Sequence, residues 1–383
     1  MKKILSAVLY LSLVCALCSC SINNNVDTIA TSTPVSPATI PAVSTNAGST
    51  RSSVIGNPAL PITKIPVTWG SLNLTGNLVY TITDQQTNAI SIRALDLANG
   101  TISTVFQAPE NAWVYFSAVS PDNQQLVISY SAPASNVSDS RPALYLLPLD
   151  GSAPPKPLFT PPSNLDEYNQ PCWSPDGKYV YFFHITLTPL TSKGQQVASV
   201  GLERVAYPGG QPEKIMASAF WPRISSDSKQ LAYVSIDPTN GKNKLFLANM
   251  DGSNSQEVVM SGNKPPDIID APLFSPDGKS ILFSAIVPVQ ASAPTWLEKL
   301  FGVTVASAHT VPSEWWSVAL TGGVPNQLTH IQTTGLYASV SQDGKYIAST
   351  SGMGLFVMHP DGSELTILID NSGGDFATLS WIP

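Results

Sequence analysis

The feature that most constrains the fold is a short motif that recurs five times along the chain. In each copy an apolar residue precedes a turn of the type Ser-Pro-Asp-Gly, and a run of β-forming residues follows the turn. Pro fixes the φ angle of a tight turn, while Asp-Gly supplies a side-chain acceptor and a residue that tolerates the left-handed conformation. Each copy therefore predicts two strands joined by a tight turn. The copies span residues 119–130, 173–184, 224–235, 274–285 and 340–351.

A second piece follows each copy at a variable distance. It consists of an apolar strand, an Asp-Gly or Gly-Gly turn and another strand, as in LFLANMDGSNSQEVV at 245–259. Four strands per repeat, recurring roughly every fifty residues, are typical of the blades of a β-propeller. The sequence predicts five complete blades, at about 110–160, 165–216, 218–261, 267–330 and 334–370.

The remaining blade combines the two ends of the repeat region. Residues 76–107 contain three expected strands with no Ser-Pro-Asp-Gly type of strand before them, and residues 376–383 resemble the missing strand. We expect this C-terminal strand to be the innermost strand of blade one, which leaves no open sheet edge at the seam. The predicted fold is all-β: a six-bladed β-propeller over residues 67–383, with four-stranded antiparallel blades.

These motifs, written SPDG at 174–177 and 275–278, resemble the WD40-like (PD40) repeats of TolB-type propellers. The resemblance covers essentially all of residues 67–383 and implies the same fold. It implies less about function, because such blades occur in TolB itself, in the non-catalytic domain of prolyl-oligopeptidase-like peptidases and in some lyases. TolB also carries an N-terminal α/β domain, for which this sequence shows no counterpart.

The N-terminal residues 1–19 have the pattern of a signal peptide. Lys2 and Lys3 precede an apolar stretch that is too short to span a bilayer comfortably. The sequence Leu17-Cys18-Ser19-Cys20 resembles the lipobox of bacterial lipoproteins, which implies a diacylglyceryl group on Cys20 and cleavage before it. Lipidation at Cys18 and an ordinary secreted protein are the alternatives. We expect a lipid-anchored protein on the extracytoplasmic face of the cell membrane, or on the outer membrane in a two-membrane bacterium.

Residues 20–66 are rich in Ser, Thr, Pro and Asn, lack aromatic residues and show no strand or helix periodicity. Such a segment cannot bury enough apolar surface to offset its ordering entropy. We therefore expect it to be a disordered tether between the lipidated cysteine and the propeller.

Composition excludes some partners and cofactors. The formal net charge is −7, and no run of Lys or Arg occurs after the leader, so nucleic acid is not an expected partner. The sequence contains no phosphate-binding glycine loop, and we expect no cofactor and a monomeric protein. Cys172 is the one cysteine after Cys20, and its apolar neighbours predict a buried structural thiol.

No catalytic set is evident in the sequence. The pentapeptide Gly-x-Ser-x-Gly of a hydrolase is absent, which excludes a peptidase of that kind. The histidines lack the spacing of metal ligands, and we predict no metal site. The turn aspartates are interpreted as hairpin acceptors rather than Ca²⁺ ligands. The histidines are His184, His309, His330 and His359, and the aspartates are Asp122, Asp176, Asp227, Asp277 and Asp343.

The strongest candidate for a binding site is the mouth of the propeller, by which we mean the face on which the innermost strands begin. The residues just before and within the start of these strands combine aromatic and charged side chains, as interaction hot spots do. The alternative is that the aromatic residues pack between blades. The candidate binding residues are Trp113, Tyr115, Tyr168, Asn169, Trp221, Arg223, Asp270, Tyr337 and Asp375.

Blade five carries a long insertion at about 286–313. If Thr295–Phe301 forms a short helix, Trp296, Leu297, Leu300 and Phe301 share one apolar face. This face either covers the side of the blade or projects to a partner or to the membrane surface.

Together these features predict a membrane-anchored binding or scaffold protein for a protein, peptide or glycan of the cell envelope. One alternative is a glycan or uronate lyase with its active site in the central pocket, which a convergent His, Arg and Tyr group with a metal would favour. Another is an accessory or sensor subunit of an envelope transport or signalling complex.

Overall fold

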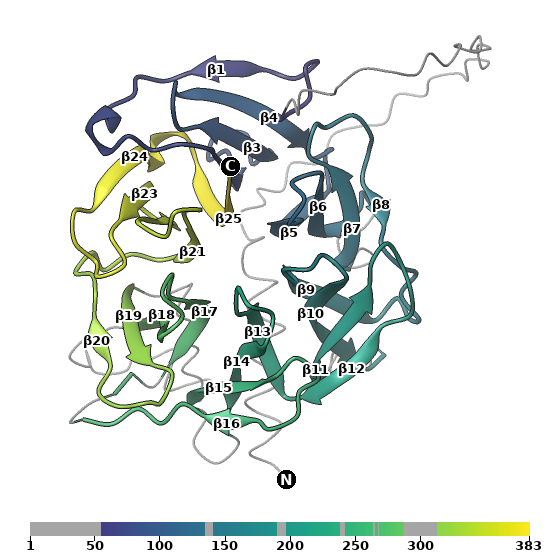
Figure 1. Ribbon diagram of the computed structural model, residues 1–383. Helices are drawn as coiled ribbons and strands as arrows, with labels where there is room; N and C mark the ends of the chain where they lie inside the picture. The colour runs from purple at the N-terminus through teal and green to yellow at the C-terminus, as the bar shows by residue number, and fades with distance from the viewer. Residues whose placement is uncertain are drawn as a thin grey trace, which may run out of the picture.

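The computed structural model describes residues 55–134, 141–189, 197–237, 242–262, 265–266, 268–286 and 312–383. In this part of the chain, six antiparallel sheets are arranged as blades around a central axis (Figure 1). The predicted all-β, six-bladed propeller is confirmed. The leader, Cys20, the tether up to residue 54 and the expected helix at Thr295–Phe301 lie outside the described residues. Among the described residues, no helix has the length and apolar character that crossing a lipid bilayer requires.

The strands of each blade follow one another outward from the axis. Blade one contains β25 (Asp375–Ile382), β2 (Asn77–Thr83), β3 (Ile90–Asp96), β4 (Thr101–Gln107) and β1 (Ile62–Lys64). Blade two contains β5 (Trp113–Val119), β6 (Gln125–Ser131), β7 (Ala143–Pro148) and β8 (Lys156–Pro157). Blade three contains β9 (Asp166–Trp173), β10 (Tyr179–Leu187), β11 (Val197–Ala206) and β12 (Glu213–Ala217).

The other three blades repeat this order. Blade four contains β13 (Ala219–Ile224), β14 (Gln230–Ile236), β15 (Asn243–Asn249) and β16 (Gln256–Glu257). Blade five contains β17 (Ile269–Phe274), β18 (Ser280–Ile286), β19 (Ser313–Ala319) and β20 (Asn326–Gln327). Blade six contains β21 (Tyr337–Val340), β22 (Ile347–Ser351), β23 (Gly354–Met358) and β24 (Thr366–Asp370). Two short 3₁₀ turns, η1 (Gly70–Leu72) and η3 (Asn371–Gly373), precede β2 and β25.

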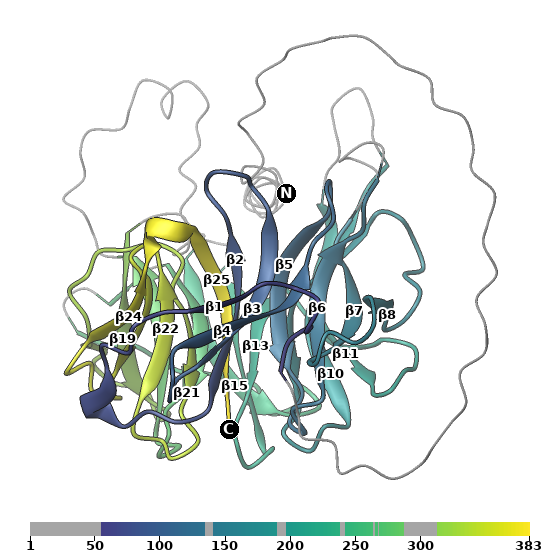
Figure 2. The ribbon, with the colours of Figure 1, turned by 90° about the horizontal axis from the view of Figure 1, so that it is seen from above.

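The ring closes as the sequence predicts, because the C-terminal strand β25 pairs antiparallel with β2. Leu78 lies opposite Trp381 and Tyr80 lies opposite Leu379. The indole N–H of Trp381 also donates to the carbonyl of Thr75 at 3.0 Å. Figure 2 shows β25 running from η3 at one end of the ring to the C-terminus at the other. Blade one is thus built from the first and the last strands of the propeller.

Blade one has a fifth strand, β1, within the segment predicted to be part of the tether. β1 pairs antiparallel with the outer edge of β4, with Thr63 opposite Ile102, so the expectation of a disordered tether up to residue 66 is wrong at Ile62–Lys64. All three residues of β1 are exposed, and backbone hydrogen bonds hold the segment. Composition did not reveal the strand because its pairing depends on the free edge of β4 and not on buried side chains.

The recurrent turns owe their shape to one serine and one aspartate. The Ser174 hydroxyl donates to Asp176 Oδ1 at 2.7 Å and accepts the Tyr179 N–H at 2.9 Å, while the Lys178 N–H donates to Asp176 Oδ1 at 3.1 Å. Gly177 takes φ 70°. The same Ser to Asp bond recurs at Ser120–Asp122, Ser225–Asp227, Ser275–Asp277 and Ser341–Asp343. The interpretation of these aspartates as turn acceptors is confirmed.

The core consists of apolar layers between neighbouring blades. On β10, Val180 and Phe182 pack in a cluster with Val127 of blade two, whereas Tyr181 packs in a cluster with Leu231 of blade four. Both faces of the strand are therefore buried. This explains why the sequence shows a continuous apolar run at 179–183 and not an alternation of apolar and polar residues.

Candidate functional site

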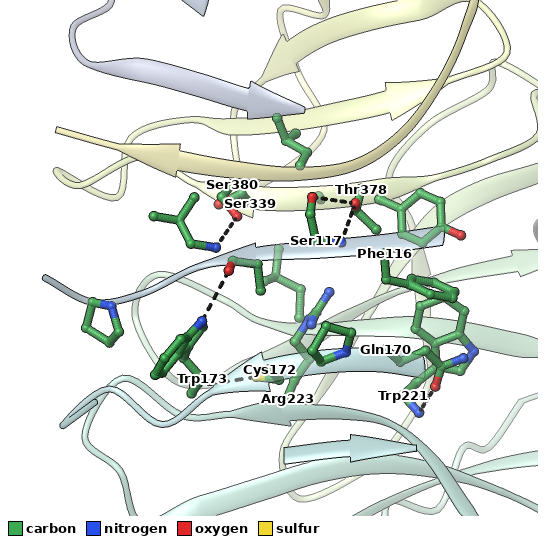
Figure 3. Close-up of a pocket in the computed structure, with 18 residues that line it drawn as sticks. Phe116, Ser117, Gln170, Cys172, Trp173, Trp221, Arg223, Ser339, Thr378 and Ser380 are labelled. Atoms are coloured by element: carbon green, nitrogen blue, oxygen red, sulfur yellow. Dashed lines mark hydrogen bonds between the residues drawn. The ribbon is translucent and has the colours of Figure 1, made fainter. Parts of the chain in front are cut away.

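The innermost strands of all six blades line one cavity of about 240 Å³ in the central channel. β5, β9, β13, β17, β21 and β25 each contribute at least one residue. Figure 3 shows the side chains that line the cavity. The lining consists of residues 116–119, Pro121, 170–173, Trp221, Arg223, Leu273, 337–339 and 378–380. A site of this construction depends on closure of the ring, because no single blade supplies more than a small arc of its wall.

Three aromatic rings from alternate blades meet at the axis. Phe116 of β5 lies 5.7 Å from Trp221 of β13 and 6.1 Å from Tyr337 of β21, measured between ring centroids. The Trp221 and Tyr337 rings are 5.7 Å apart. We refer to these three residues as the aromatic trio. Because the rings contact one another from three sides, they close the channel at this level.

The cavity lies on one side of the aromatic trio. In each innermost strand the lining residues are at the level of the trio or farther along the strand, and Pro121 belongs to the turn between β5 and β6. The cavity therefore occupies the part of the channel near the Ser-Pro-Asp-Gly turns. The predicted mouth is at the opposite end, where the innermost strands begin.

Hydroxyl groups in the lining bridge neighbouring blades. Thr378 Oγ1 of β25 accepts the Ser117 N–H of β5 at 2.9 Å, and the two hydroxyls lie 2.9 Å apart (Figure 3). Ser380 Oγ accepts the Val119 N–H at 3.3 Å. Ser339 Oγ of β21 accepts the Trp381 N–H at 2.9 Å. Side-chain oxygens thus satisfy backbone N–H groups that face the axis and have no strand partner there.

Three of the nine predicted binding residues line the cavity: Trp221, Arg223 and Tyr337. The structure places the other six elsewhere. Trp113 packs against the cluster between blades one and two, and Tyr115 lies at the register shift of β5. Asp375 is exposed, and its carboxylate accepts the Gln85 amide at 3.0 Å. Tyr168, Asn169 and Asp270 are buried, with 1%, 2% and 3% of their surface exposed.

Bulges in the innermost strands explain why the place of a residue within its strand did not predict whether its side chain lines the cavity. The pairing of β5 with β6 shifts between Val114 and Phe116, so that Phe116 and not Tyr115 reaches the aromatic trio. Gln170, Trp221 and Ala271 each adopt a positive φ at the corresponding shifts of β9, β13 and β17, and each precedes a proline. A bulge re-aims the side chains that follow it and so breaks the two-residue alternation on which such a prediction relies.

Most of the polar lining was not among the predicted binding residues. Ser117, Ser339, Thr378 and Ser380 are small residues of β5, β21 and β25, and the only signal in the sequence that points to them is that these strands are the innermost ones of their blades. Cys172 departs from its prediction in part: it is a free thiol, as expected, but it is half-buried and lines the cavity. The neighbouring Trp173 also lines the cavity, and its indole N–H donates to the carbonyl of Ala118 at 3.1 Å.

The mouth side of blade three carries a compact group of ionisable residues. His184 Nδ1 lies 2.8 Å from Glu203 Oε1, and His184 Nε2 lies 3.1 Å from Asp166 Oδ1. Tyr168 stacks on the imidazole at 4.4 Å. Burial lowers the pKa of His184, but the two carboxylates outweigh it and hold that pKa above its usual value. This group lies outside the lining of the central cavity.

The buried Glu167 beside this group pairs with Arg141, with 2.7 Å between Oε1 and the guanidinium. Burial raises the pKa of Glu167, and Arg141 counteracts part of that effect. In the described part of the chain, no group of three or more His, Cys, Asp or Glu side chains is arranged to hold a metal ion. Of the three residue types that a lyase site was expected to bring together, the cavity contains Arg223 and Tyr337 and no histidine among the described residues.

Comparison of the sequence with protein-family models and with curated proteins gave no match. Solved structures match the fold. TolB from Acinetobacter baumannii is 18% identical, with a TM-score of 0.56 over 80% of this chain and 67% of that chain. A putative TolB from Agrobacterium tumefaciens is 17% identical, with a TM-score of 0.52 over 81% of this chain and 100% of that chain. A chain of a nidogen/laminin complex is 12% identical, with a TM-score of 0.52 over 79% of this chain and 97% of that chain. This chain therefore has the fold of a TolB-like six-bladed β-propeller.

Proposed function

We propose that this chain is a lipid-anchored extracytoplasmic protein whose propeller binds a partner of the cell envelope in its central cavity. The observation that carries the binding role is the cavity itself, which all six innermost strands line and which combines the aromatic trio with hydroxyl groups and one arginine. Aromatic and arginine side chains supply most of the energy of known recognition sites. The TolB proteins share the fold, which supports a binding or scaffold role in general terms.

The cavity is suited to a small part of a larger partner. A volume of about 240 Å³ holds a side chain or a chain end, and not a folded domain. The aromatic trio forms one wall, so an inserted group has apolar surface on that side and polar groups along the strands. We therefore propose recognition of a short exposed segment, with the remainder of the partner on the turn face of the propeller.

The anchor rests on the sequence alone, and Cys20→Ser tests it. With the full chain produced in a bacterial host in the presence of radiolabelled palmitate, we expect the label on the protein to fall to background, because the residue that carries the acyl chains is gone. We also expect the variant to run as a larger species that retains the apolar leader, because cleavage follows lipidation of Cys20. The matched control is Cys18→Ser, for which the label and the size of the mature protein should persist. Loss of label in Cys18→Ser and its retention in Cys20→Ser would contradict the assignment.

The binding role is tested by photocrosslinking in whole cells. A benzoylphenylalanine residue in place of Tyr337 puts the reactive ketone at the cavity wall and retains an aromatic ring there. The control position is Ile62 on the outer strand β1, where 61% of the residue is exposed. We expect discrete adducts from position 337 that are absent from position 62. The same adducts from both positions, or none from position 337, would rule out the cavity as the binding site.

A further inference from the structure

Arg223 determines the charge of the cavity, because it is the one charged residue among the described residues of the lining. It is half-buried, and within the described part of the chain its guanidinium forms no ion pair or hydrogen bond. Other arginines of the protein are engaged: Arg141 pairs with Glu167 at 2.7 Å, and Arg204 donates to the Tyr181 hydroxyl at 3.0 Å. In a chain of net charge −7, a half-buried cation with no carboxylate beside it is an unusual arrangement that an external anion would complete.

Other polar groups that line the same cavity have donor capacity left. Ser339 Oγ accepts the Trp381 N–H and Ser380 Oγ accepts the Val119 N–H, and neither hydroxyl hydrogen has an acceptor among the described residues. Gln170 Oε1 accepts the Trp221 N–H at 2.7 Å, which fixes the orientation of that amide and leaves its NH₂ group as a further donor. The part of the lining that the structure describes contains no aspartate or glutamate. The site thus offers one cation and several donors with no competing carboxylate.

We infer that the cavity binds a carboxylate, and specifically the C-terminal carboxylate of a peptide segment, with Arg223 as the residue that pairs with it. The planar guanidinium matches a carboxylate with two parallel hydrogen bonds, and one positive charge balances one negative charge. A phosphate dianion would leave excess negative charge. This inference rests on the proposed binding role and names the chemistry of its ligand.

The rest of the lining favours a peptide over a sugar acid. Val119, Pro171, Leu273 and Leu379 are apolar, and the aromatic trio closes the cavity at one end. An apolar C-terminal side chain can bury its surface there. A uronic acid would instead place several hydroxyls against these apolar and aromatic surfaces, and each buried hydroxyl without a hydrogen-bond partner costs free energy.

The test measures binding of small probes to the full-length protein in detergent by titration calorimetry. The peptide probe is N-acetylphenylalanine, and its matched control is N-acetylphenylalaninamide, which differs only by replacement of the carboxylate. We expect the acid to bind at least tenfold more tightly than the amide, because hydrogen bonds to a charged group are the strong ones. Equal affinity for acid and amide would overturn the inference. Tighter binding of glucuronate or of inorganic phosphate than of N-acetylphenylalanine would overturn the choice of a peptide carboxylate.

Substitutions of Arg223 test whether this residue causes the preference for the acid over the amide. Arg223→Gln should weaken binding of the acid at least tenfold and leave the amide unchanged, whereas Arg223→Lys should restore only part of the loss because an ammonium lacks the planar fork. Arg93→Gln is the matched control, since Arg93 lies on β3 outside the cavity and should have no effect. Arg223→Gln should also leave the unfolding midpoint equal or higher, because no described partner is unpaired by the change. A lower midpoint would show a structural role instead.

The outcomes separate this inference from the proposed function. If crosslinking from position 337 yields adducts and Arg223→Gln leaves them unchanged, binding in the cavity stands and the carboxylate assignment is wrong. If position 337 yields no adducts, the cavity is not the binding site, whatever the small probes show.

Discussion

Deletion of residues 375–383 is expected to unfold the whole propeller and not blade one alone. The deletion removes β25, which pairs with β2 and supplies Thr378 and Ser380 to the neighbouring blade. Three of its apolar side chains, Phe376, Leu379 and Ile382, are at most 7% exposed. Burial of such a side chain contributes about 1.5–3 kcal/mol, so these three account for roughly 5–9 kcal/mol. That is comparable to the total stability of a typical protein, about 5–15 kcal/mol.

The measurement is urea unfolding of the full-length and truncated chains, followed by tryptophan fluorescence and circular dichroism. We expect the truncated chain to show no cooperative transition. The matched control removes Ile62–Lys64 alone, the outer strand β1; its three residues are exposed, so its loss should lower the midpoint only slightly. A cooperative transition in the chain without 375–383, at a midpoint close to that of the full chain, would show that closure by β25 is dispensable.

The second large effect is expected for Trp315→Ala in blade five. The Trp315 side chain is fully buried, and its indole N–H donates to Ser349 Oγ of blade six at 3.0 Å. Its backbone N–H donates to Thr329 Oγ1 at 2.9 Å, so the residue also anchors the connection between these blades. Replacement of a buried tryptophan by alanine costs about 3–5 kcal/mol in transfer free energy and cavity formation. The free energy of unfolding in urea should fall by that amount.

The next residue provides the control for this variant. Trp316 points to the other side of β19 and is only half-buried, so Trp316→Ala should cost about 1 kcal/mol. Trp315→Phe separates the two contributions, since it retains an aromatic ring and removes the donor to Ser349. A similar loss for both alanine variants would mean that burial in the layer between blades five and six is not what stabilises this region.

The fold could be predicted from the sequence because the residues that shape each turn are close together in the chain and recur in five of the six blades. The Ser174 hydroxyl and the Asp176 carboxylate shape their turn through contacts within six residues, and the same chemistry recurs in four other blades. The seam was predictable for a related reason: residues 376–383 have the pattern of the one strand that blade one lacked. The outer strand β1 was not predictable, since it depends on the free edge of β4 and buries no side chain.

The site was only partly predictable, because lining the axis depends on register and not on composition. Trp221, Arg223 and Tyr337 were identified, but Phe116 was passed over in favour of Trp113 and Tyr115. The register shift between β5 and β6 turns Phe116, and not Tyr115, toward the axis. Nothing in the local sequence indicates that this shift occurs. The small hydroxyl residues of β21 and β25 carry no compositional signal of their own, so their role emerges only once six strands are brought together.

The outer strand β1 also has a mechanical consequence. A pull on the chain from upstream of residue 55 is transmitted first to the segment that holds Gly56, Asn57 and β1 against blades one and two, and not to the joint between β2 and β25. β1 has three paired positions with β4, and it can peel away one bond at a time under a small force. Detachment of β1 from the outer edge of blade one therefore comes before any force acts on the pairing of β2 with β25, which closes the ring.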